Sequence, residues 1–270
     1  MAPTRDANSS VHQEMFVSEL CARREAAKLS RNKLAAALGC TPQWLAKVET
    51  FEKPPSEGLA DDLDTYFQAG GMFRRTWEKH LAARRRGLIP SGFRPLIEAE
   101  KDASEISIYE PVLITGLFQC EEYARLAFSV GLHPEKAKEL VAIRMERQVI
   151  LTEDGGPVVF LLIRESVIRD VPAAVRLAQC EHLLSLAERP KVLVQLLPRS
   201  ALVFQPTGFQ VLRFEHSTDV AYVEGTGGNG RMLDDPAAVR NLAVLFNVAR
   251  SEALSARDSA ALIRSIMEDT

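Results

Sequence analysis

The chain has few of the residues that cross-link a small protein or bind a metal. Only 4 of its 270 residues are cysteines, Cys21, Cys40, Cys120 and Cys180, and their spacing fits neither a metal site nor a disulfide framework. They stand among apolar neighbours, so we expect reduced, buried thiols. The 5 histidines are equally scattered, without a metal-ligand partner at helical spacing. We therefore expect no metal and no cofactor.

Long apolar runs are also missing. No run approaches the roughly 18 residues that a membrane span needs, and the polar start of the chain does not resemble a signal peptide. We expect a cytoplasmic protein without membrane contact. The net charge of −3 is uneven, because residues 1–90 carry +3 and residues 91–270 carry −6. A mildly basic N-terminal part and an acidic C-terminal part are consistent with nucleic-acid binding by the N-terminal part.

Motifs of catalysis are equally scarce. The glycine-rich stretch at 225–230 lacks the Gly-Lys-Ser/Thr ending of a phosphate-binding loop and does not have dinucleotide-binding spacing. We interpret it as a flexible loop after a strand. No Gly-x-Ser-x-Gly nucleophile motif is present. The sequence does not indicate an enzyme.

Residues 29–54 carry the clearest positive signal, a helix, a glycine turn and a second helix. Ser30 can cap the first helix, and Gly39 can adopt the left-handed conformation that ends it. Thr41 can cap the second helix, with Pro42 in its first turn, where a missing N–H costs nothing. The inward positions of the two helices are Leu34, Ala35, Leu38, Leu45 and Val48. Two short helices joined by a tight turn are typical of a DNA-reading element, although similar hairpins also occur in proteins that never touch DNA.

The outward face of this element suggests how DNA would be bound. Gln43 and Lys47, four residues apart, are the leading candidates for contacts with base edges. Arg31 and Lys33, near the start of the supporting helix, are candidates for phosphate contacts. Trp44 lies on the shoulder of the second helix and fits a packing role better than base reading. The predicted DNA-binding residues are Arg31, Lys33, Thr41, Gln43, Trp44 and Lys47.

This pattern resembles the lambda-repressor-like (XRE-type) helix-turn-helix family, and residues 13–28 look like the first helix of its domain. The resemblance implies sequence-specific binding to double-stranded DNA. Two departures are visible. Arg31 stands where the family commonly has a glutamine that braces the phosphate backbone, and Thr50-Phe51 stands where a glycine-bearing turn is usual after Glu49.

Composition and periodicity divide the chain. We expect a disordered tail over 1–12, an all-α helix-turn-helix domain over 13–86, a linker over 87–95 and a second domain over 96–270. In the second domain, helices are expected over 117–130, 135–151, 173–188, 236–254 and 259–267, and strands over 158–163, 192–197, 209–214 and 220–223. Helices on both sides of a group of strands predict an α+β domain with a mostly antiparallel sheet.

The second domain has motifs of its own. GLFQCEEYAR at 116–125, R-x-x-R-Q at 144–148 and DVAYVE at 219–224 resemble signatures of a large group of actinobacterial regulators, which includes the WhiJ-like developmental regulators of streptomycetes. The resemblance implies an XRE-type helix-turn-helix joined to a domain of poorly defined function. Such regulators are often encoded beside small partner proteins.

Arg144, Arg147 and Gln148 fall in the apolar seam of the helix expected over 135–151. Long polar side chains in such a seam must be paired, reach water or face a ligand. We expect a structural ion-pair network, with Glu165 and Glu224 as partners because each follows an expected strand. A pocket for an acidic ligand or partner peptide is the alternative. The candidate ligand- or partner-binding residues are Arg144, Arg147, Gln148, Glu165, Tyr222 and Glu224.

Together these features predict a sequence-specific transcriptional regulator. Its second domain would sense a small-molecule effector or a small partner protein, and a homodimer is expected. The alternative is a protein-interaction adaptor that keeps the helix-turn-helix fold, contacts DNA weakly and acts through a small partner protein.

Overall fold

The computed structural model describes residues 11–131, 134–226 and 229–268. The chain divides into two compact units, Met1–Leu88 and Ile89–Thr270, each with its own hydrophobic core. The division falls inside the linker that was expected over 87–95. Of the tail expected to be disordered, residues 1–10 lie outside the described residues, whereas residues 11–12 begin the first helix.

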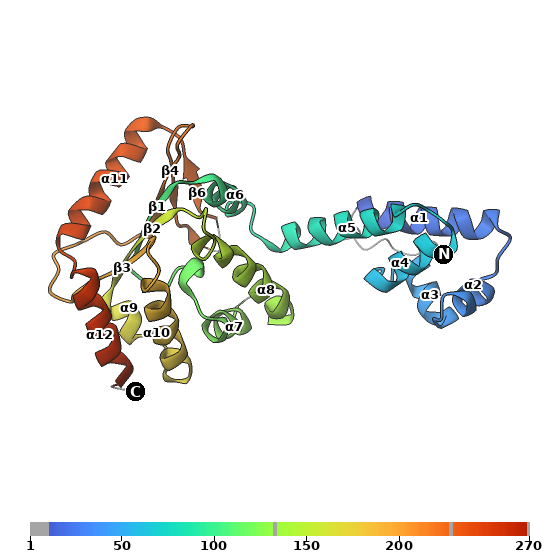
Figure 1. Cartoon of the computed structure of the whole chain (residues 1–270), viewed down its shortest axis with the longest axis horizontal. Coiled ribbons are helices and arrows are strands. Elements are labelled where there is room, and N and C mark those ends of the chain that lie inside the picture. The colour runs from blue at the N-terminus through green and yellow to red at the C-terminus, as the bar shows by residue number, and fades with distance from the viewer. Residues whose placement is uncertain (1–10, 132–133, 227–228, 269–270) are drawn as a thin grey trace. The chain divides into compact units, whose positions relative to one another are not determined.

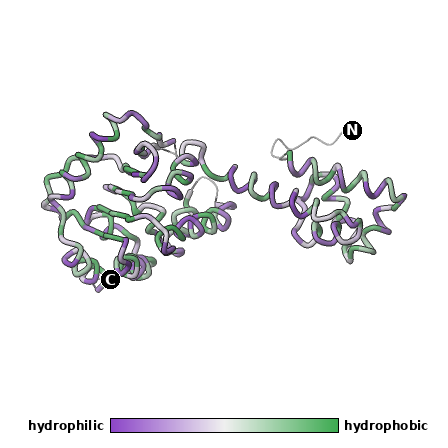
Figure 2. The backbone as a smooth tube through the Cα atoms, turned by 45° about the horizontal axis from the view of Figure 1, so that its top comes forward, coloured by the Kyte–Doolittle hydropathy of each residue, from purple (hydrophilic) through white to green (hydrophobic). Residues whose placement is uncertain are grey.

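Helices make up the described part of the first unit (Figure 1). They are α1 (Val11–Ala26), α2 (Arg31–Ala37), α3 (Pro42–Glu49), α4 (Glu57–Tyr66) and α5 (Met72–Leu88). Their inward faces supply a core of fully buried side chains that includes Phe16, Leu20, Leu34, Leu45 and Leu63. Because the apolar residues recur at helical spacing, each helix buries one face and leaves the other to solvent. Figure 2 shows the resulting alternation of hydrophobic and hydrophilic residues along the helices.

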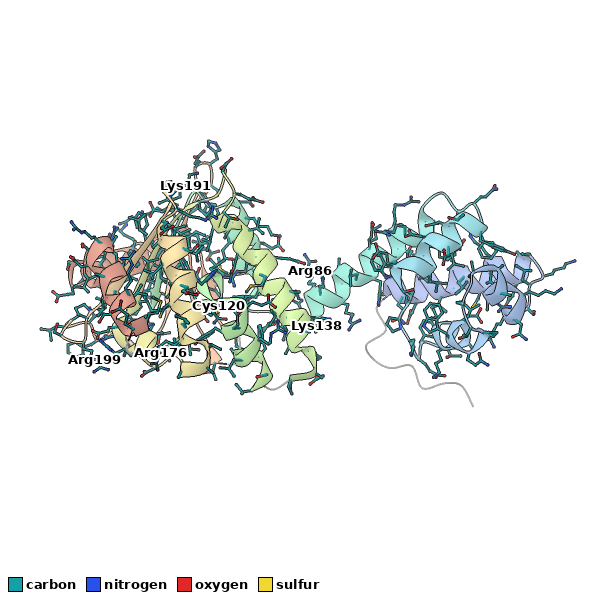
Figure 3. All side chains as sticks on the ribbon, turned by 60° about the horizontal axis from the view of Figure 1, so that its bottom comes forward. Arg86, Cys120, Lys138, Arg176, Lys191 and Arg199 are labelled. Atoms are coloured by element: carbon teal, nitrogen blue, oxygen red, sulfur yellow. The ribbon has the colours of Figure 1, made fainter. Side chains whose placement is uncertain are left out.

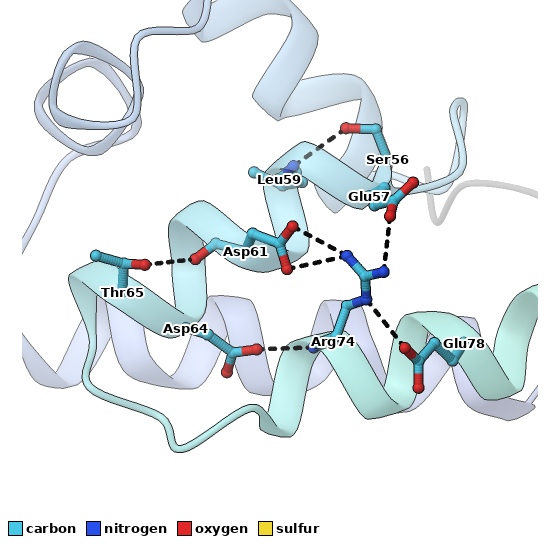
Figure 4. A network of polar contacts seen from close by, with 8 residues as sticks. All are labelled: Ser56, Glu57, Leu59, Asp61, Asp64, Thr65, Arg74 and Glu78. Carbon is cyan, nitrogen blue, oxygen red and sulfur yellow. Dashed lines mark hydrogen bonds and ion pairs between the residues drawn. The ribbon is translucent and has the colours of Figure 1, made fainter.

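A polar network joins α4 to α5 (Figure 4). The guanidinium of Arg74 contacts the carboxylates of Glu57 at 2.7 Å, Asp61 at 3.0 Å and Glu78 at 3.0 Å. Asp64 accepts the backbone N–H of Arg74 at 2.8 Å and so satisfies a donor in the first turn of α5. Ion pairs this exposed contribute little singly, so we assign the network to fixing the angle between the helices.

The second unit is an α+β domain around a six-stranded mixed sheet, as the sequence predicts. Its strands are β1 (Glu105–Glu110), β2 (Val158–Arg164), β3 (Val192–Leu197), β4 (Phe209–Arg213), β5 (Val220–Val223) and β6 (Arg231–Leu233). The strand order is β3-β2-β1-β4-β5-β6. Most pairings are antiparallel, namely β1 with β4, β4 with β5 and β5 with β6, whereas β1–β2 and β2–β3 are parallel.

Helices cover both faces of this sheet. The α-helices of the second unit are α6 (Arg94–Asp102), α7 (Glu121–Ser129), α8 (Ala137–Arg147), α9 (Glu165–Arg169), α10 (Ala173–Ala187), α11 (Pro236–Ser251) and α12 (Ala256–Glu268). Three short 3-10 helices, η1 (Gly116–Phe118), η2 (Pro134–Lys136) and η3 (Gln148–Leu151), lie in the connections. One face packs against α11, and the other packs against α6, α10 and α12, together with η1 (Figure 1).

The register brings three chain segments to one edge of the sheet. Tyr109 pairs with Phe209, so Glu110, the last residue of β1, lies beside Gly208. The backbone N–H of Glu224 donates to the carbonyl of Gly208 at 3.0 Å, which places the end of β5 next to both. Because β1, β2 and β3 are parallel, their carboxyl ends share this edge. Figure 3 marks the two ends of β3 by Lys191 before it and Arg199 after it.

The sequence analysis missed strands β1 and β6, helices α6 and α9, and one helix break. Strands β1 and β6 were not predicted, because the polar residues of β1 interrupt its apolar run and β6 is only 3 residues long. The helix expected over 117–130 is interrupted, since η1 ends at Phe118 and α7 begins only at Glu121. Gln179 of α10 satisfies the broken backbone, donating to the carbonyl of Phe118 at 2.7 Å and accepting the N–H of Cys120 at 2.9 Å. Residues 227–228 of the expected glycine-rich loop lie outside the described residues.

Candidate nucleic-acid interface and buried polar cluster

The helix-turn-helix has the caps that its sequence predicts. The Ser30 hydroxyl accepts the N–H of Lys33 at 3.3 Å, and the Thr41 hydroxyl accepts the N–H of Trp44 at 3.2 Å. Gly39 has a φ of +65°, the left-handed conformation that glycine adopts at least cost. Each cap satisfies an N–H that the first helical turn leaves without a partner. The α2–α3 element is therefore fixed by its own short-range chemistry.

Glu49, the last residue of α3, links this element to α1 through buried ion pairs. Its side chain is only 1% exposed and accepts hydrogen bonds from the guanidinium of Arg24 in α1, at 2.8 Å, and from that of Arg31 in α2. The hydrogen bond to Glu49 raises the pKa of Arg24 above its ordinary value. The sequence analysis missed this role, because the partners lie 25 and 18 residues away from Glu49.

Arg31 therefore has a structural partner in addition to its predicted role at a phosphate. Its side chain remains 49% exposed, so part of the guanidinium still faces solvent. Phe51, in the turn after α3, has a φ of +64° and packs against the core of the first unit. The chain thus makes the left-handed turn after α3 without glycine, and the packing of the Phe51 ring offsets the steric cost.

The outward face of α3 is available for contact. Gln43, Lys47, Thr41 and Lys33 are exposed, whereas Leu45 and Val48 on the opposite side are fully buried. Trp44 is only partly buried and packs against the hydrophobic core. Its partial burial favours packing against the core over contact with DNA bases.

A second set of polar residues gathers at the carboxyl edge of β1 in the other unit. We call it the polar cluster and define it as Glu100, Glu110, Arg144, Arg147, Tyr222 and Glu224. At its centre the guanidinium of Arg147 donates two hydrogen bonds to the carboxylate of Glu100, and both side chains are buried, at 6% and 1% exposure. The same guanidinium lies 4.7 Å from the centre of the Phe93 ring. Arg147 is thus part of an ion pair, as the sequence predicts, but its partner is Glu100.

Arg144 has a different environment. It donates to the side-chain oxygen of Gln119 at 2.5 Å and lies 4.2 Å from the centre of the Phe128 ring, and it forms no ion pair within the described ranges. Burial, together with the positive charge of Arg147, lowers the pKa of Arg144 to about 10. A buried cation without a carboxylate partner is costly unless something else neutralises it.

The turn at Gly116 explains why both arginines and Gln148 belong to one motif. The Gln148 amide donates to the carbonyl of Gly116 at 2.8 Å and to that of Gln119 at 2.7 Å. A Cβ atom at Gly116 would lie 3.1 Å from Nε of Arg144 and 3.4 Å from a terminal nitrogen of Arg147. Glycine therefore lets the turn approach two guanidinium groups closely.

Glu165 does not take part in this cluster, so its prediction as a partner is wrong. Its carboxylate is paired with Arg169 at 2.7 Å and accepts the backbone N–H of Arg199 at 3.1 Å. The reason is local, because Glu165 opens α9 and Arg169 follows one helical turn later.

The acids Glu110 and Glu224 meet above Gly208. A Cβ atom there would lie 2.9 Å from Oε2 of Glu110 and 3.3 Å from Cγ of Glu224. Burial, with the charge of the other acid as the next cause for Glu110, raises the pKa of Glu110 well above its ordinary value, and burial also raises that of Glu224. In the part of the chain that the structure describes, neither carboxyl group has a hydrogen-bonding or ion-pairing partner.

Two buried side chains beside these acids also have polar atoms without a partner. Both atoms of the Gln210 amide and the Tyr222 hydroxyl make no hydrogen bond to any described residue. Gln210 is 1% exposed and Tyr222 is fully buried. The Tyr222 hydroxyl lies against the backbone of Gly230 without hydrogen-bond geometry, and burial raises its pKa to about 12. Each such buried group costs about 1–3 kcal/mol when nothing pairs with it.

The opposite face of the sheet has a small cavity of about 130 Å³ between the strands and α11. Its lining includes Glu105, Phe160, Arg213, Asn247 and Arg250. Both arginines there are already paired, since Arg213 contacts Glu105 at 2.5 Å and Arg250 donates to Gln195 at 2.7 Å. This cavity is therefore a weaker candidate for a ligand site than the polar cluster, where several polar groups lack partners among the described residues.

The capped α2–α3 pair with an exposed recognition face defines the first unit as a helix-turn-helix domain. Residues 16–77 match that family, which supports a DNA-binding regulator. Residues 93–265 match a family described as a domain of unknown function (DUF5753). That match covers more than half of the chain, so the chain belongs to this family.

No curated protein and no solved structure matches the chain. Among the described residues, no helix has both the length and the apolar character needed to cross a bilayer. No group of three or more histidine, cysteine or acidic side chains in the described ranges could hold a metal ion.

Proposed function

We propose that this protein is a sequence-specific transcriptional regulator of the XRE type, within the WhiJ-like actinobacterial group that its motifs resemble. The exposed Gln43–Lys47 face of α3 carries the proposal, because its opposite face is buried and its start is capped. Helix α3 would enter the major groove, where a glutamine can bond to adenine and a lysine can donate to guanine.

Contacts with phosphates would position α3 on the duplex. Lys33 and Thr41 are exposed near the starts of α2 and α3, and helix N-termini favour anions. Arg31 would contribute the part of its guanidinium that Glu49 leaves exposed. Trp44 would support the fold of α3 more than it would touch DNA. A homodimer would place two such helices on two half-sites.

The second unit would sense an effector through the polar cluster. The support is a set of groups without partners among the described residues. They are the buried atoms of Gln210 and Tyr222, the carboxyl groups of Glu110 and half-buried Glu224, and Arg144, which has no ion-pair partner in the described ranges. These groups lie outside the carboxyl end of β1, and the strand order of the sheet reverses between β1 and β4. Ligands of open α/β sheets bind at such a switch point.

An adaptor that contacts DNA weakly and acts through a small partner protein is the second candidate. One observation favours it, a set of exposed apolar side chains in the loops at the same edge of the sheet. They are Val112, Leu113, Leu202 and Phe204, of which Phe204 is 89% exposed. Exposed apolar side chains at one edge of a sheet can mark a protein-binding surface.

One experiment separates the two candidates. The full chain is mixed with sheared genomic DNA at low and at physiological salt, and the retained fragments are sequenced. A regulator enriches defined sites at both salt concentrations, since base contacts survive screening. An adaptor retains DNA without sequence preference at low salt and releases it at physiological salt. Sedimentation of the chain with and without an enriched site then tests the homodimer.

A further inference from the structure

We propose that the polar cluster binds a small organic cation, an ammonium or guanidinium group that lies between the carboxylates of Glu110 and Glu224. This inference rests on the sensing role proposed for the second unit and names the chemical class of its ligand. The sequence suggested an acidic ligand for the arginines of this region. The placement of the acids points to the opposite charge.

The polar cluster contains one more carboxyl group than it has arginines. Arg147 and Glu100 neutralise each other through their paired hydrogen bonds. Arg144 is turned toward Gln119 and the Phe128 ring, so it is not bonded to either remaining acid. Glu110 and Glu224 are left facing each other over Gly208, within described surroundings that offer no hydrogen bond to either carboxyl group. A cation placed between them would stabilise the ionised form of both acids.

Beside the two acids, the Gln210 amide and the Tyr222 hydroxyl are buried and have no hydrogen-bond partner among the described residues. Gln210 pairs in register with Tyr222 across β4 and β5 and with Ile108 across β1 and β4. Cross-strand partners of this kind place their side chains on the same face of the sheet, and Glu110 and Glu224 follow two residues further on the same face. The amide oxygen of Gln210 and the Tyr222 hydroxyl can accept the N–H groups that point away from the carboxylates.

Access comes from half-buried residues in and beside the polar cluster. Glu224, Tyr123 and Gly116 keep some exposure, whereas Glu110, Gln210 and Tyr222 form the buried end. The exposed side of the site is therefore at Glu224, and the buried side is at Gln210. We expect a ligand with one charged end and a stem that extends toward solvent, and we expect a quaternary ammonium, which cannot donate a hydrogen bond, to bind poorly.

The test is calorimetric titration of the full chain with agmatine, which carries a guanidinium and an ammonium, and with butylamine. Butyrate and tetramethylammonium serve as ligand controls. We expect agmatine and butylamine to bind, and Glu224→Gln and Glu110→Gln each to weaken this binding by about tenfold or more, because one charged partner is lost. Glu98→Gln, an exposed acid of α6, is the matched control and should bind as the unchanged protein does. Tyr222→Phe should bind more weakly without change of net charge.

Several results would overturn the proposal. They are no heat of binding with either amine, binding of butyrate in place of amines, or equal amine affinity in Glu98→Gln and Glu224→Gln. Far-ultraviolet circular dichroism of each variant confirms that it is folded, and Tyr222→Phe provides a second test if Glu110→Gln does not fold. A second measurement uses buffers of different ionisation enthalpy. Cation binding should release protons, because it favours the ionised form of Glu110 and Glu224. The other titratable groups around this pair are Glu100, Arg144, Arg147, Tyr123 and Tyr222.

The titration also separates this inference from the proposed regulatory function. DNA binding is measured on the same samples with and without agmatine. Amine binding that leaves DNA binding unchanged keeps the cation site and refutes its sensing role. DNA binding without any amine binding keeps the regulator and refutes the cation site.

Discussion

The carboxylate of Glu100 in α6 is held by two hydrogen bonds from Arg147 in α8, although 47 residues separate them in the chain. Both side chains are almost completely buried. A buried ion pair contributes little net stability compared with apolar residues, but removing one partner leaves an uncompensated charge. This pair therefore connects α6 to α8, and we expect replacement of either residue alone to destabilise the second unit.

Arg147→Leu should destabilise the second unit by about 3–5 kcal/mol, because it leaves Glu100 buried without its partner. For a unit of this size the melting temperature should fall by about 10 °C. Circular dichroism detects this transition, whereas tryptophan fluorescence should not change, since Trp44 and Trp77 both lie in the first unit. Arg125→Leu is the control, because Arg125 and its partner Glu121 are exposed on α7. An equal loss in both variants would contradict a special role for the buried pair.

Glu49→Gln should destabilise the first unit by about 3 kcal/mol, since the neutral amide cannot neutralise both Arg24 and Arg31. Here the tryptophan fluorescence should report an earlier transition in denaturant, and the second unit should be unaffected. Glu25→Gln is a matched control, because Glu25 also contacts Arg24 but is 71% exposed. If both variants unfold at the same denaturant concentration, Glu49 does not hold the three helices together.

Gln43→Ala should weaken binding to an enriched DNA site by about 1–3 kcal/mol and leave binding to random duplex nearly unchanged. The reason is that an amide that bonds to a base edge contributes only where that base is present. Fluorescence anisotropy with cognate and scrambled duplexes measures both affinities. Equal losses on the two duplexes would argue against direct readout by Gln43.

Lys33→Ala should weaken binding to all duplexes alike and reduce the slope of log affinity against log salt by about 1. Arg31→Ala should do the same and also lower the stability of the first unit, because Arg31 is bonded to Glu49. Lys101→Ala, in the second unit, should change neither quantity. A salt slope that stays constant in Lys33→Ala would show that this lysine does not contact a phosphate.

Glu110→Gln should make the stability of the second unit less dependent on pH. The folded protein raises the pKa of Glu110, so the folded state holds this proton more tightly than the unfolded state. Stability should therefore fall as pH rises above the ordinary carboxyl pKa, until Glu110 ionises in the folded state as well. The variant should be at least as stable as the unchanged protein at about pH 8 and should lose this advantage near pH 4. Thermal melts over this range, with Glu98→Gln as control, would reveal the opposite trend if Glu110 were ionised and paired.

The sequence by itself determined the parts of this protein whose physics is local. The helix-turn-helix could be predicted because Ser30, Gly39, Thr41 and Pro42 each act on backbone groups within four residues. Strands β2, β3, β4 and β5 could be predicted because each is a short, mostly apolar run. The seam of Arg144, Arg147 and Gln148 was visible for the same reason, since helical spacing places them on one face.

Only the tertiary structure decided which groups meet. The partner of Arg147, which is Glu100, and the partners of Glu49, which are Arg24 and Arg31, could not be read from spacing. Strand β1 has Glu105, Ser107 and Glu110 in its sequence, and it is central only because its neighbours on both sides supply its hydrogen bonds. Pairing across a sheet depends on the path of the whole chain, which local periodicity does not encode. The meeting of Glu110, Gly208 and Glu224 at one edge is the result of that path.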